Sequence, residues 1–157
     1  MGRPVGPALI FLSLFAVSCH LIPPHLKPLP SADEQRAMVQ RNDLRLHRLS
    51  SRAFLEAWGP PTYEYRATTQ FFAVEDGNYI PRFLVPTGEA PPNSEDVAMA
   101  GDGYFLAYEQ RGEVVGFLDD RLVYRSRMSA EKIRALGKQW QRESQFHTDV
   151  ERSLTPR

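Results

Sequence analysis

The strongest constraint on the fold is a change in the spacing of apolar residues at Gly59-Pro60-Pro61. Before this point, Phe54, Ala57 and Trp58 lie close to one face of a short helix, which the glycine and the prolines end. A helix of about two turns is marginal alone, so we expect its apolar face to pack on a sheet. After this point the pattern is typical of a half-buried strand, with polar residues at every second position between Tyr63, Tyr65, Ala67, Thr69 and Phe71.

The rest of the sheet is predicted downstream of this strand. Asp76-Gly77 indicates a turn, after which residues 79–85 can return as a second strand that Pro81 confines to a sheet edge. Residues 86–103 contain three prolines and predict a long loop. Segments rich in β-branched and aromatic residues then predict an antiparallel meander with a tight turn at Asp119-Asp120, its strands being 103–108, 112–118 and 121–125.

Two further helix signals flank the predicted sheet. Ser31 and Glu34 fit a capping box that opens a polar helix as far as about residue 41. Ser50 is expected to cap the helix that contains Phe54. Its neighbour Leu49 completes a hydrophobic staple with Phe54. Residues 129–146 predict a C-terminal helix with an apolar face formed by Ile133, Leu136 and Trp140.

These elements predict an α+β fold. Short helices pack on one antiparallel sheet of three to five strands, and a helix follows the sheet at the C-terminus. We assign residues 31–146 to this single domain and residues 147–157 to a polar tail that frays. A chain of 157 residues is long enough for one domain with its own core.

The N-terminal segment has the pattern of an export signal. Arg3 precedes an apolar run over residues 8–17, which is too short for the roughly 20 residues that a membrane-spanning helix needs. The sequence Phe15-Ala16-Val17-Ser18-Cys19 resembles a bacterial lipobox. This resemblance implies that residues 1–18 are a lipoprotein signal peptide and that Cys19 becomes the lipidated first residue. The alternative is an ordinary secretory signal followed by a free thiol.

The resemblance to a lipobox also implies a location. Two or more acyl chains hold a protein on a membrane stably, so the anchor would fix where the domain resides. The residue after Cys19 is His20 rather than the Asp associated with inner-membrane retention, which implies the periplasmic face of the outer membrane. Residues 19–30 contain Pro23, Pro24, Pro28 and Pro30 and predict an extended tether between lipid and domain.

Composition argues against several classes of function. The 19 Lys and Arg residues balance the 19 Asp and Glu residues, which predicts no basic patch for nucleic acid or for an anionic membrane. One cysteine excludes an internal disulfide framework and multi-thiolate metal sites. The histidines His20, His25, His47 and His147 lack metal-ligand spacing. The acidic pairs fall at predicted turns, namely Glu75-Asp76, Glu95-Asp96 and Asp119-Asp120.

The sequence therefore indicates no enzyme, no metal and no cofactor. Nothing resembles a nucleophile elbow, and Gly101-Asp102-Gly103 leads into a strand rather than into the helix that follows a phosphate loop. An enzyme would require a buried pair such as His47 with a carboxylate, which the spacing in the sequence does not reveal.

The order of these elements is similar to that of the BamE/SmpA-like small outer-membrane lipoproteins over about residues 49–127. Two motifs carry the resemblance, Phe54-Leu55-Glu56-Ala57-Trp58-Gly59-Pro60-Pro61 and Val115-Gly116-Phe117-Leu118-Asp119-Asp120-Arg121-Leu122-Val123. They are similar to the family's helix end with its exit into the first strand and to the family's last hairpin. The chain differs in having Asp120 where Gly is usual, a long loop between strands and an added C-terminal helix. The resemblance assigns structural roles alone to Trp58, Gly59, Pro60 and Asp119.

The resemblance implies a non-catalytic accessory of outer-membrane protein assembly, or an envelope-stabilising lipoprotein. We expect an envelope protein partner, with residues 79–85 and the loop over 86–103 as contact regions, because strand edges and long loops present unpaired backbone. The alternative is a lipid-tethered binding or inhibitor module for a periplasmic enzyme or a cell-wall fragment. A pocket in which aromatic and Arg side chains converge would favour this alternative.

Overall fold

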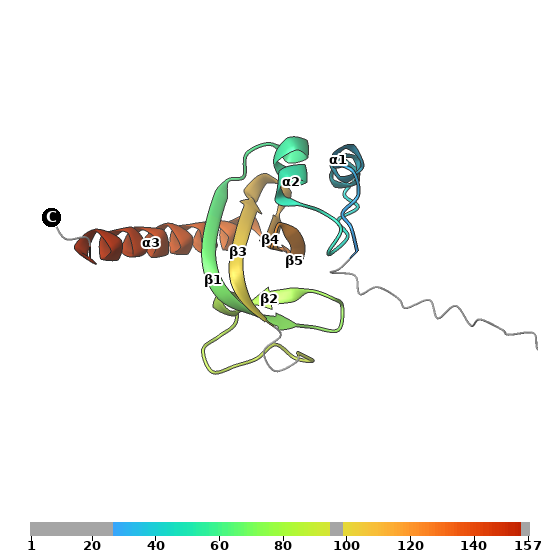
Figure 1. The fold of residues 1–157 in the computed structure, drawn as a ribbon. Helices are drawn as coiled ribbons and strands as arrows, with labels where there is room; N and C mark the ends of the chain where they lie inside the picture. The colour runs from blue at the N-terminus through green and yellow to red at the C-terminus, as the bar shows by residue number, and fades with distance from the viewer. Residues whose placement is uncertain (1–26, 95–98, 155–157) are drawn as a thin grey trace, which may run out of the picture.

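The computed structural model describes residues 27–94 and 99–154, with side chains up to residue 146 (Figure 1). The predicted signal peptide, Cys19 and most of the predicted tether lie outside these residues. The α+β prediction is confirmed, with helices on a five-stranded antiparallel sheet and a C-terminal helix. The elements are α1 (Ala32–Gln40), α2 (Ser51–Trp58), β1 (Tyr63–Ala73), β2 (Tyr79–Pro81), η2 (Arg82–Leu84), β3 (Met99–Tyr108), η3 (Glu109–Arg111), β4 (Glu113–Leu118), β5 (Arg121–Arg127) and α3 (Ala130–Leu154).

The sheet has the strand order β2-β1-β3-β4-β5. Strand β3 starts earlier than the sequence pattern predicts, because Met99 to Asp102 pair with Phe71 to Thr68 of β1. The prediction of a loop up to residue 103 is therefore wrong for its last part. Pairing with a long neighbouring strand satisfies the backbone of Gly101 and Gly103, whose local preference is for turns.

Helices cover both faces of the sheet (Figure 1). Helices α1 and α2 pack on one face, where their buried side chains meet those of β3, β4 and β5: Met38, Val39, Leu49, Phe54, Leu106, Val115, Phe117 and Leu122. Helix α3 packs on the other face through Ile133, Leu136 and Trp140. These side chains meet buried residues of the strands: Tyr65, Phe71, Phe105, Ala107, Val114 and Leu118. Alternate residues of β3 and β4 point to opposite faces, which is why β4 and the last four residues of β3 are buried on both sides.

The start of α2 differs from its prediction. Ser50 is the N-cap residue and Leu49 and Phe54 are both fully buried in one cluster, but the Ser50 side chain makes no capping bond. The amide of Ser50 donates to Gln35 Oε1 at 2.8 Å, and the amide of Ser51 donates to Asp120 Oδ1 at 2.9 Å. Acceptors from distant segments therefore satisfy the first amides of the helix. In α1, by contrast, Ser31 accepts from the amide of Glu34 as predicted.

Helix α3 is longer than predicted. It begins after Ser129 and continues to Leu154, through most of the segment predicted to be a polar tail. Trp140 is buried and stacks on Tyr65, with ring centroids 5.4 Å apart. Beyond the sheet the helix continues past β1, away from the body of the domain (Figure 1). None of the helices in the described residues is both long and apolar enough to cross a bilayer.

The edge of the sheet at β5 is largely occupied. Along β5, Leu122 accepts from the amide of His47 and donates to the carbonyl of Leu49. The amide of Arg125 donates to Asn78 Oδ1 at 3.0 Å, so the β1–β2 turn also reaches β5. At the opposite edge, β2 ends at Pro81 after three residues. The β1–β2 turn thus reaches across to β5, whereas the outer edge of β1 from Tyr63 to Gln70 pairs with no strand in the part of the chain that the structure describes.

The last residues of the predicted tether belong to the domain. The carbonyl of Lys27 accepts from Arg121 at 2.8 Å, that of Pro28 accepts from Arg48 at 2.9 Å, and that of Pro30 accepts from Gln35 at 2.8 Å. Residues 27–30 are therefore fastened to the domain through backbone carbonyl groups. Prolines made this segment look independent of the domain, but their carbonyl oxygens still accept hydrogen bonds from the body of the protein.

Candidate functional site

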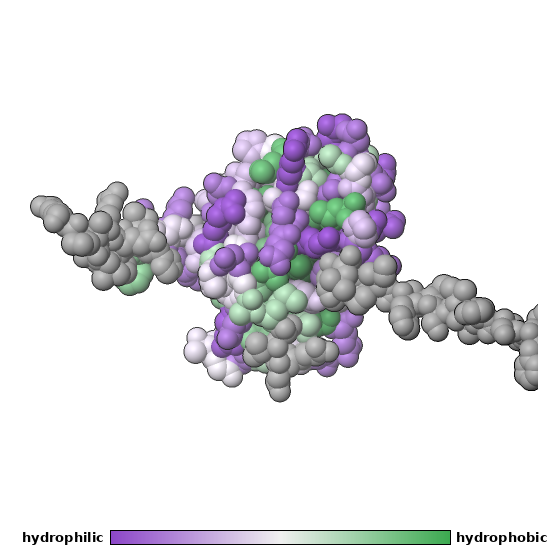
Figure 2. Space-filling view, viewed as in Figure 1, coloured by the Kyte–Doolittle hydropathy of each residue, from purple (hydrophilic) through white to green (hydrophobic). Residues whose placement is uncertain are grey.

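The face of the sheet that carries α1 and α2 is left partly open over β1. Its polar residues Glu64, Arg66 and Thr68 are exposed, as the alternation in the sequence predicts. Tyr104 on the neighbouring strand donates its hydroxyl to Glu64 Oε2 at 2.8 Å, and Arg66 Cζ lies 3.7 Å from the centre of the Tyr104 ring. In Figure 2, hydrophilic residues lie between hydrophobic ones on the side of the domain that faces the viewer. The side chains of Glu64, Arg66 and Tyr104 form an ordered polar surface.

A cavity of about 310 Å³ opens on this surface, next to the N-terminus of α2. Its lining includes Ser51, Arg66, Tyr104 and Phe117. The carboxylates of Asp102, Asp119 and Asp120 complete the lining and give the cavity negative charge. Tyr104 packs against the buried cluster that contains the α2 residues Ala53 and Phe54. The pKa of Tyr104 is raised, first by desolvation and then by its hydrogen bond to Glu64, so the hydroxyl remains a donor at neutral pH. The site can bind a polar ligand through charge, hydrogen bonds and an aromatic ring.

A second, smaller cavity of about 210 Å³ is lined by residues of the first sequence motif. Trp58 stands edge-on to Tyr108, with ring centroids 5.1 Å apart, and Arg111 Cζ lies 4.6 Å from the centre of the Trp58 ring. Pro60 and Pro61 complete the groove. The predicted helix end thus also contributes to a surface where an Arg and two aromatic residues converge.

Gly59 sets the course of the chain beside this smaller cavity. Its φ of 79° lies in the region that favours glycine, and its amide still donates to Leu55 as the last bond of α2. Its carbonyl accepts from the Tyr108 hydroxyl at 3.2 Å. Burial raises the pKa of Tyr108, so this hydroxyl also remains a donor. The glycine therefore turns the chain and fixes one aromatic wall of the groove.

The second motif forms the predicted tight turn between β4 and β5. Asp119 and Asp120 both have positive φ, 49° and 54°, which is the geometry of a type I′ turn. Asp119 is exposed and lines the larger cavity. Asp120 stands where the resembled family usually has Gly, and its carboxylate bonds to Ser51. A hydrogen bond across the fold accounts for this departure.

Among the other chemistry-bearing residues in the described part of the chain, His47 lines a cavity of about 200 Å³ together with Asp119 and Arg121. His47 is buried, has a φ of 61° and meets the Tyr79 ring at 5.2 Å. The pair Glu75-Asp76 lies at the β1–β2 turn, where Asp76 accepts from Asn78. Residues 95 and 96 and the histidines at 20, 25 and 147 fall outside the described side chains. Within that same part, His, Cys, Asp and Glu form no group that could hold a metal ion.

Sequence reasoning missed Arg66 and Asp102 as members of a site. Arg66 is one of several polar residues on the outer side of a predicted strand, and Asp102 falls in the predicted loop over residues 86–103. Only the pairing of Arg66 with Tyr104 across β1 and β3 brings them beside the β4–β5 turn. The sequence pattern that could have indicated this site is a run of polar residues on one predicted strand next to a strand rich in tyrosine. In the comparisons with known proteins, no family model, no curated protein and no solved structure matches this chain.

Proposed function

We propose that this chain is a non-catalytic lipoprotein of the bacterial cell envelope, anchored through Cys19 to the periplasmic face of the outer membrane. The observation that carries the proposal is the single cysteine placed directly after small residues at the end of a short apolar run. The exposure of Lys27, where the described chain begins, supports it, because a segment leading to Cys19 can leave the domain without crossing its core.

The domain would act as a docking or accessory component for an envelope protein. Two polar surfaces with ordered aromatic and Arg side chains support this role, one at Arg66 and Tyr104 and the other at Trp58 and Arg111. Tyr, Trp and Arg are enriched at protein interfaces, where they combine a rigid apolar body with a polar end. The similarity to BamE/SmpA-like lipoproteins favours a partner in outer-membrane protein assembly.

Lipid labelling tests the anchor. The expressed chain is expected to incorporate labelled palmitate and to accumulate as a precursor in the presence of globomycin, and Cys19→Ala is expected to abolish both. Mass spectrometry that found residue 1 still present, or an unmodified thiol on a secreted chain, would contradict the anchor.

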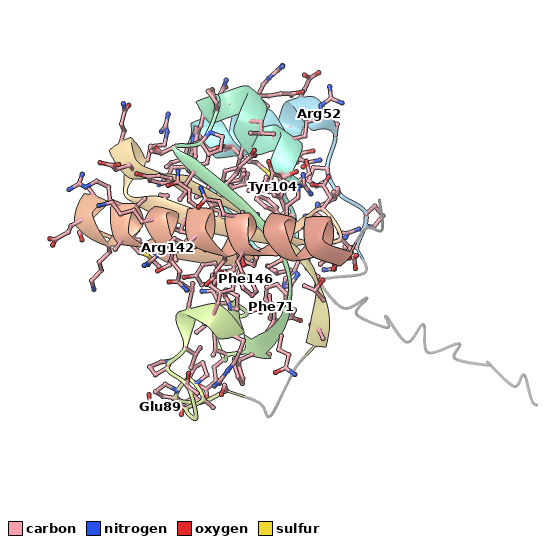
Figure 3. All side chains as sticks on the ribbon, turned by 90° about the vertical axis from the view of Figure 1, so that its left-hand side faces the viewer. Arg52, Phe71, Glu89, Tyr104, Arg142 and Phe146 are labelled. Atoms are coloured by element: carbon pink, nitrogen blue, oxygen red, sulfur yellow. The ribbon has the colours of Figure 1, made fainter. Side chains whose placement is uncertain are left out.

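Site-specific crosslinking tests the docking role. A photoreactive residue in place of Arg66 is expected to capture an envelope protein in intact cells, whereas the same residue in place of Arg142 serves as the control. Arg142 is also exposed, but it lies on α3 (Figure 3), away from both cavities. Equal capture at the two positions would count against a dedicated surface on the sheet.

A second candidate function is a lipid-tethered binding or inhibitor module. The cavity in which Arg66 and Tyr104 meet three carboxylates favours it, because this combination can recognise a cell-wall fragment or a loop of a periplasmic enzyme. Calorimetric titration with muropeptides distinguishes the two candidates. Saturable binding that Tyr104→Ala removes would favour the binding module, and no heat of binding would favour docking to a protein.

A further inference from the structure

The structure fixes the point at which the chain leaves the domain toward its N-terminus. Three side chains hold the carbonyl groups of residues 27–30, and they come from separate elements, namely Gln35 of α1, Arg48 of the α1–α2 connection and Arg121 of β5. Each distance is between 2.8 and 2.9 Å, within the range of good hydrogen bonds. Residues 27–30 therefore cannot act as a swivel, and the connection to Cys19 reduces to the intervening residues 20–26.

We propose, on the basis of the proposed lipid anchor, that the domain rests in one orientation, with an anchor-proximal surface against the phosphate-bearing headgroups of the membrane. This surface is defined by Lys27, Arg45, Arg48, Arg121 and Arg125. Hydrogen bonds connect it, because Arg121 also donates to the carbonyl of His47 and Arg125 donates to that of Leu44, both in the α1–α2 connection. The free end of α3 then points away from the membrane.

The length of the connector excludes the inverted orientation. The eight steps from Cys19 to Lys27 span at most about 29 Å, at up to roughly 3.6 Å per residue for a fully extended chain. A globular domain of this size is roughly 35 Å across. To place the side opposite Lys27 on the membrane, the chain would have to leave the domain farther from the bilayer than the connector can reach.

Charge favours the same orientation. Arg48, Arg121 and Arg125 donate to neutral carbonyl groups, and within the described residues none of them forms an ion pair, so their positive charges are not neutralised. Asp43 pairs with Arg45, while Asp76 and Asp119 lie in cavities next to Arg125 and Arg121. With Asp120, the chain neighbour of Arg121, four carboxylates lie beside the five cations, so one cation is in excess, and an excess cation near an anionic surface contributes about 1 kcal/mol. The balanced composition of the whole chain hides this local excess.

The opposite end of the domain is α3. Figure 1 shows its C-terminal end on the other side of the sheet from the start of the described chain. Phe146 on this part of the helix is 67% exposed, and it is placed with Arg142 beyond the packed residue Trp140. In the proposed orientation this end of the molecule is presented to the periplasm.

Fluorescence quenching on vesicles tests the orientation. Because Cys19 carries lipid in the mature protein, a cysteine introduced by Arg45→Cys or Arg142→Cys is the only free thiol, and each change removes one exposed arginine. Both variants are labelled with the same fluorophore and reconstituted into vesicles of phosphatidylethanolamine and phosphatidylglycerol. A quencher attached to the headgroups is expected to reduce the fluorescence at position 45 more than at position 142, and iodide in the buffer is expected to show the reverse.

The outcomes separate this inference from the proposed function. Failure of the wild-type chain to acquire lipid and to float with vesicles would overturn the proposed function, and the orientation with it. Flotation with equal quenching at the two positions would overturn the orientation alone. Adding Arg48→Gln and Arg121→Gln to the Arg45→Cys protein releases residues 27 and 28, and it is expected to reduce the difference between the two positions. An unchanged difference would show that the hydrogen bonds to residues 27 and 28 do not set the orientation.

Discussion

The carboxylate of Asp120 accepts hydrogen bonds from both the backbone amide and the hydroxyl of Ser51, at 2.9 and 2.6 Å. Ser51 is the first residue of α2, so a side chain from the β4–β5 turn takes the place of a local cap. A negative charge at this end of a helix is also favoured by the helix dipole. This contact fastens the last hairpin of the sheet to the helix that enters it.

Replacing Asp120 with Asn is therefore expected to destabilise the domain by about 1 kcal/mol, because the charge-assisted bonds become neutral ones. Asn tolerates the left-handed conformation that this residue adopts, so the change does not add strain. Urea unfolding of both proteins measures the difference. The control is Asp33→Asn, since Asp33 lies in an exposed ion pair with Arg36 and its loss is expected to cost less. A cost at Asp120 no larger than at Asp33 would contradict the capping role.

Gln35 is expected to be among the most sensitive polar residues. It is buried, and its amide group accepts from the Ser50 amide and donates to the Pro30 carbonyl, both at 2.8 Å. Gln35→Met keeps the volume of the side chain but leaves a buried donor without a partner, which is expected to cost about 2 kcal/mol. Thermal unfolding followed by circular dichroism checks this, with the exposed Gln40→Met on the same helix as the control. If both changes had the same small effect, the bridge at Gln35 would be unimportant.

Gly137 in α3 is expected to resist replacement by Ala. Alanine is the better helix former by about 1 kcal/mol, which alone would stabilise the protein. A Cβ atom at position 137, however, would overlap the ring of Tyr63 on β1, so the helix would have to move away from the sheet. Gly137→Ala is expected to destabilise the domain by roughly 1 to 3 kcal/mol. The exposed Lys138→Ala is the control, and a gain in stability at position 137 would show that α3 does not pack this closely.

Stability is expected to fall in alkaline solution. Burial, and then a hydrogen bond of 2.6 Å to Glu143, raise the pKa of Tyr65 above its ordinary value near 10. Above pH 10 the unfolded chain loses this proton while the folded protein retains it, so the stabilisation is complete below pH 10 and declines as pH rises toward the folded pKa. Tyr65→Phe is expected to lower stability at pH 7 and to weaken its decline above pH 10. Chemical unfolding at pH 7 and pH 11 checks both, and an unchanged slope would be contrary to this account.

The features of the fold that depend on residues close together in the chain were predicted correctly from the sequence. The alternation from Tyr63 to Phe71 and the abrupt stop at Gly59 are local patterns, and both appear in the structure as predicted. The turn at Asp119-Asp120 also has a local cause, because these residue types tolerate positive φ. The fold class followed, since helices with one apolar face need a sheet to cover.

The parts that sequence reasoning missed depend on distant partners. The strand from Met99 exists because β1 is long enough to pair with it, which outweighs the turn preference of its glycines. The bonds from Asp120 to Ser51 and from Arg121 to Lys27 join residues far apart in the chain. The candidate cavity has the same origin, since Arg66, Asp102 and Asp119 come from three different parts of the sequence. No local sequence pattern indicates which of these distant residues come into contact.

Under the proposed lipid anchor, the occupied edge of β5 has a consequence for how copies of the protein meet on a crowded membrane. Proteins confined to two dimensions collide far more often than the same proteins in solution, and an open strand would let each molecule recruit the next into a growing ribbon. Here the connection between α1 and α2 already occupies Leu122, and Asn78 occupies Arg125, so neighbours find no template there. Crowded copies of the protein are therefore not expected to associate with one another by strand addition at β5.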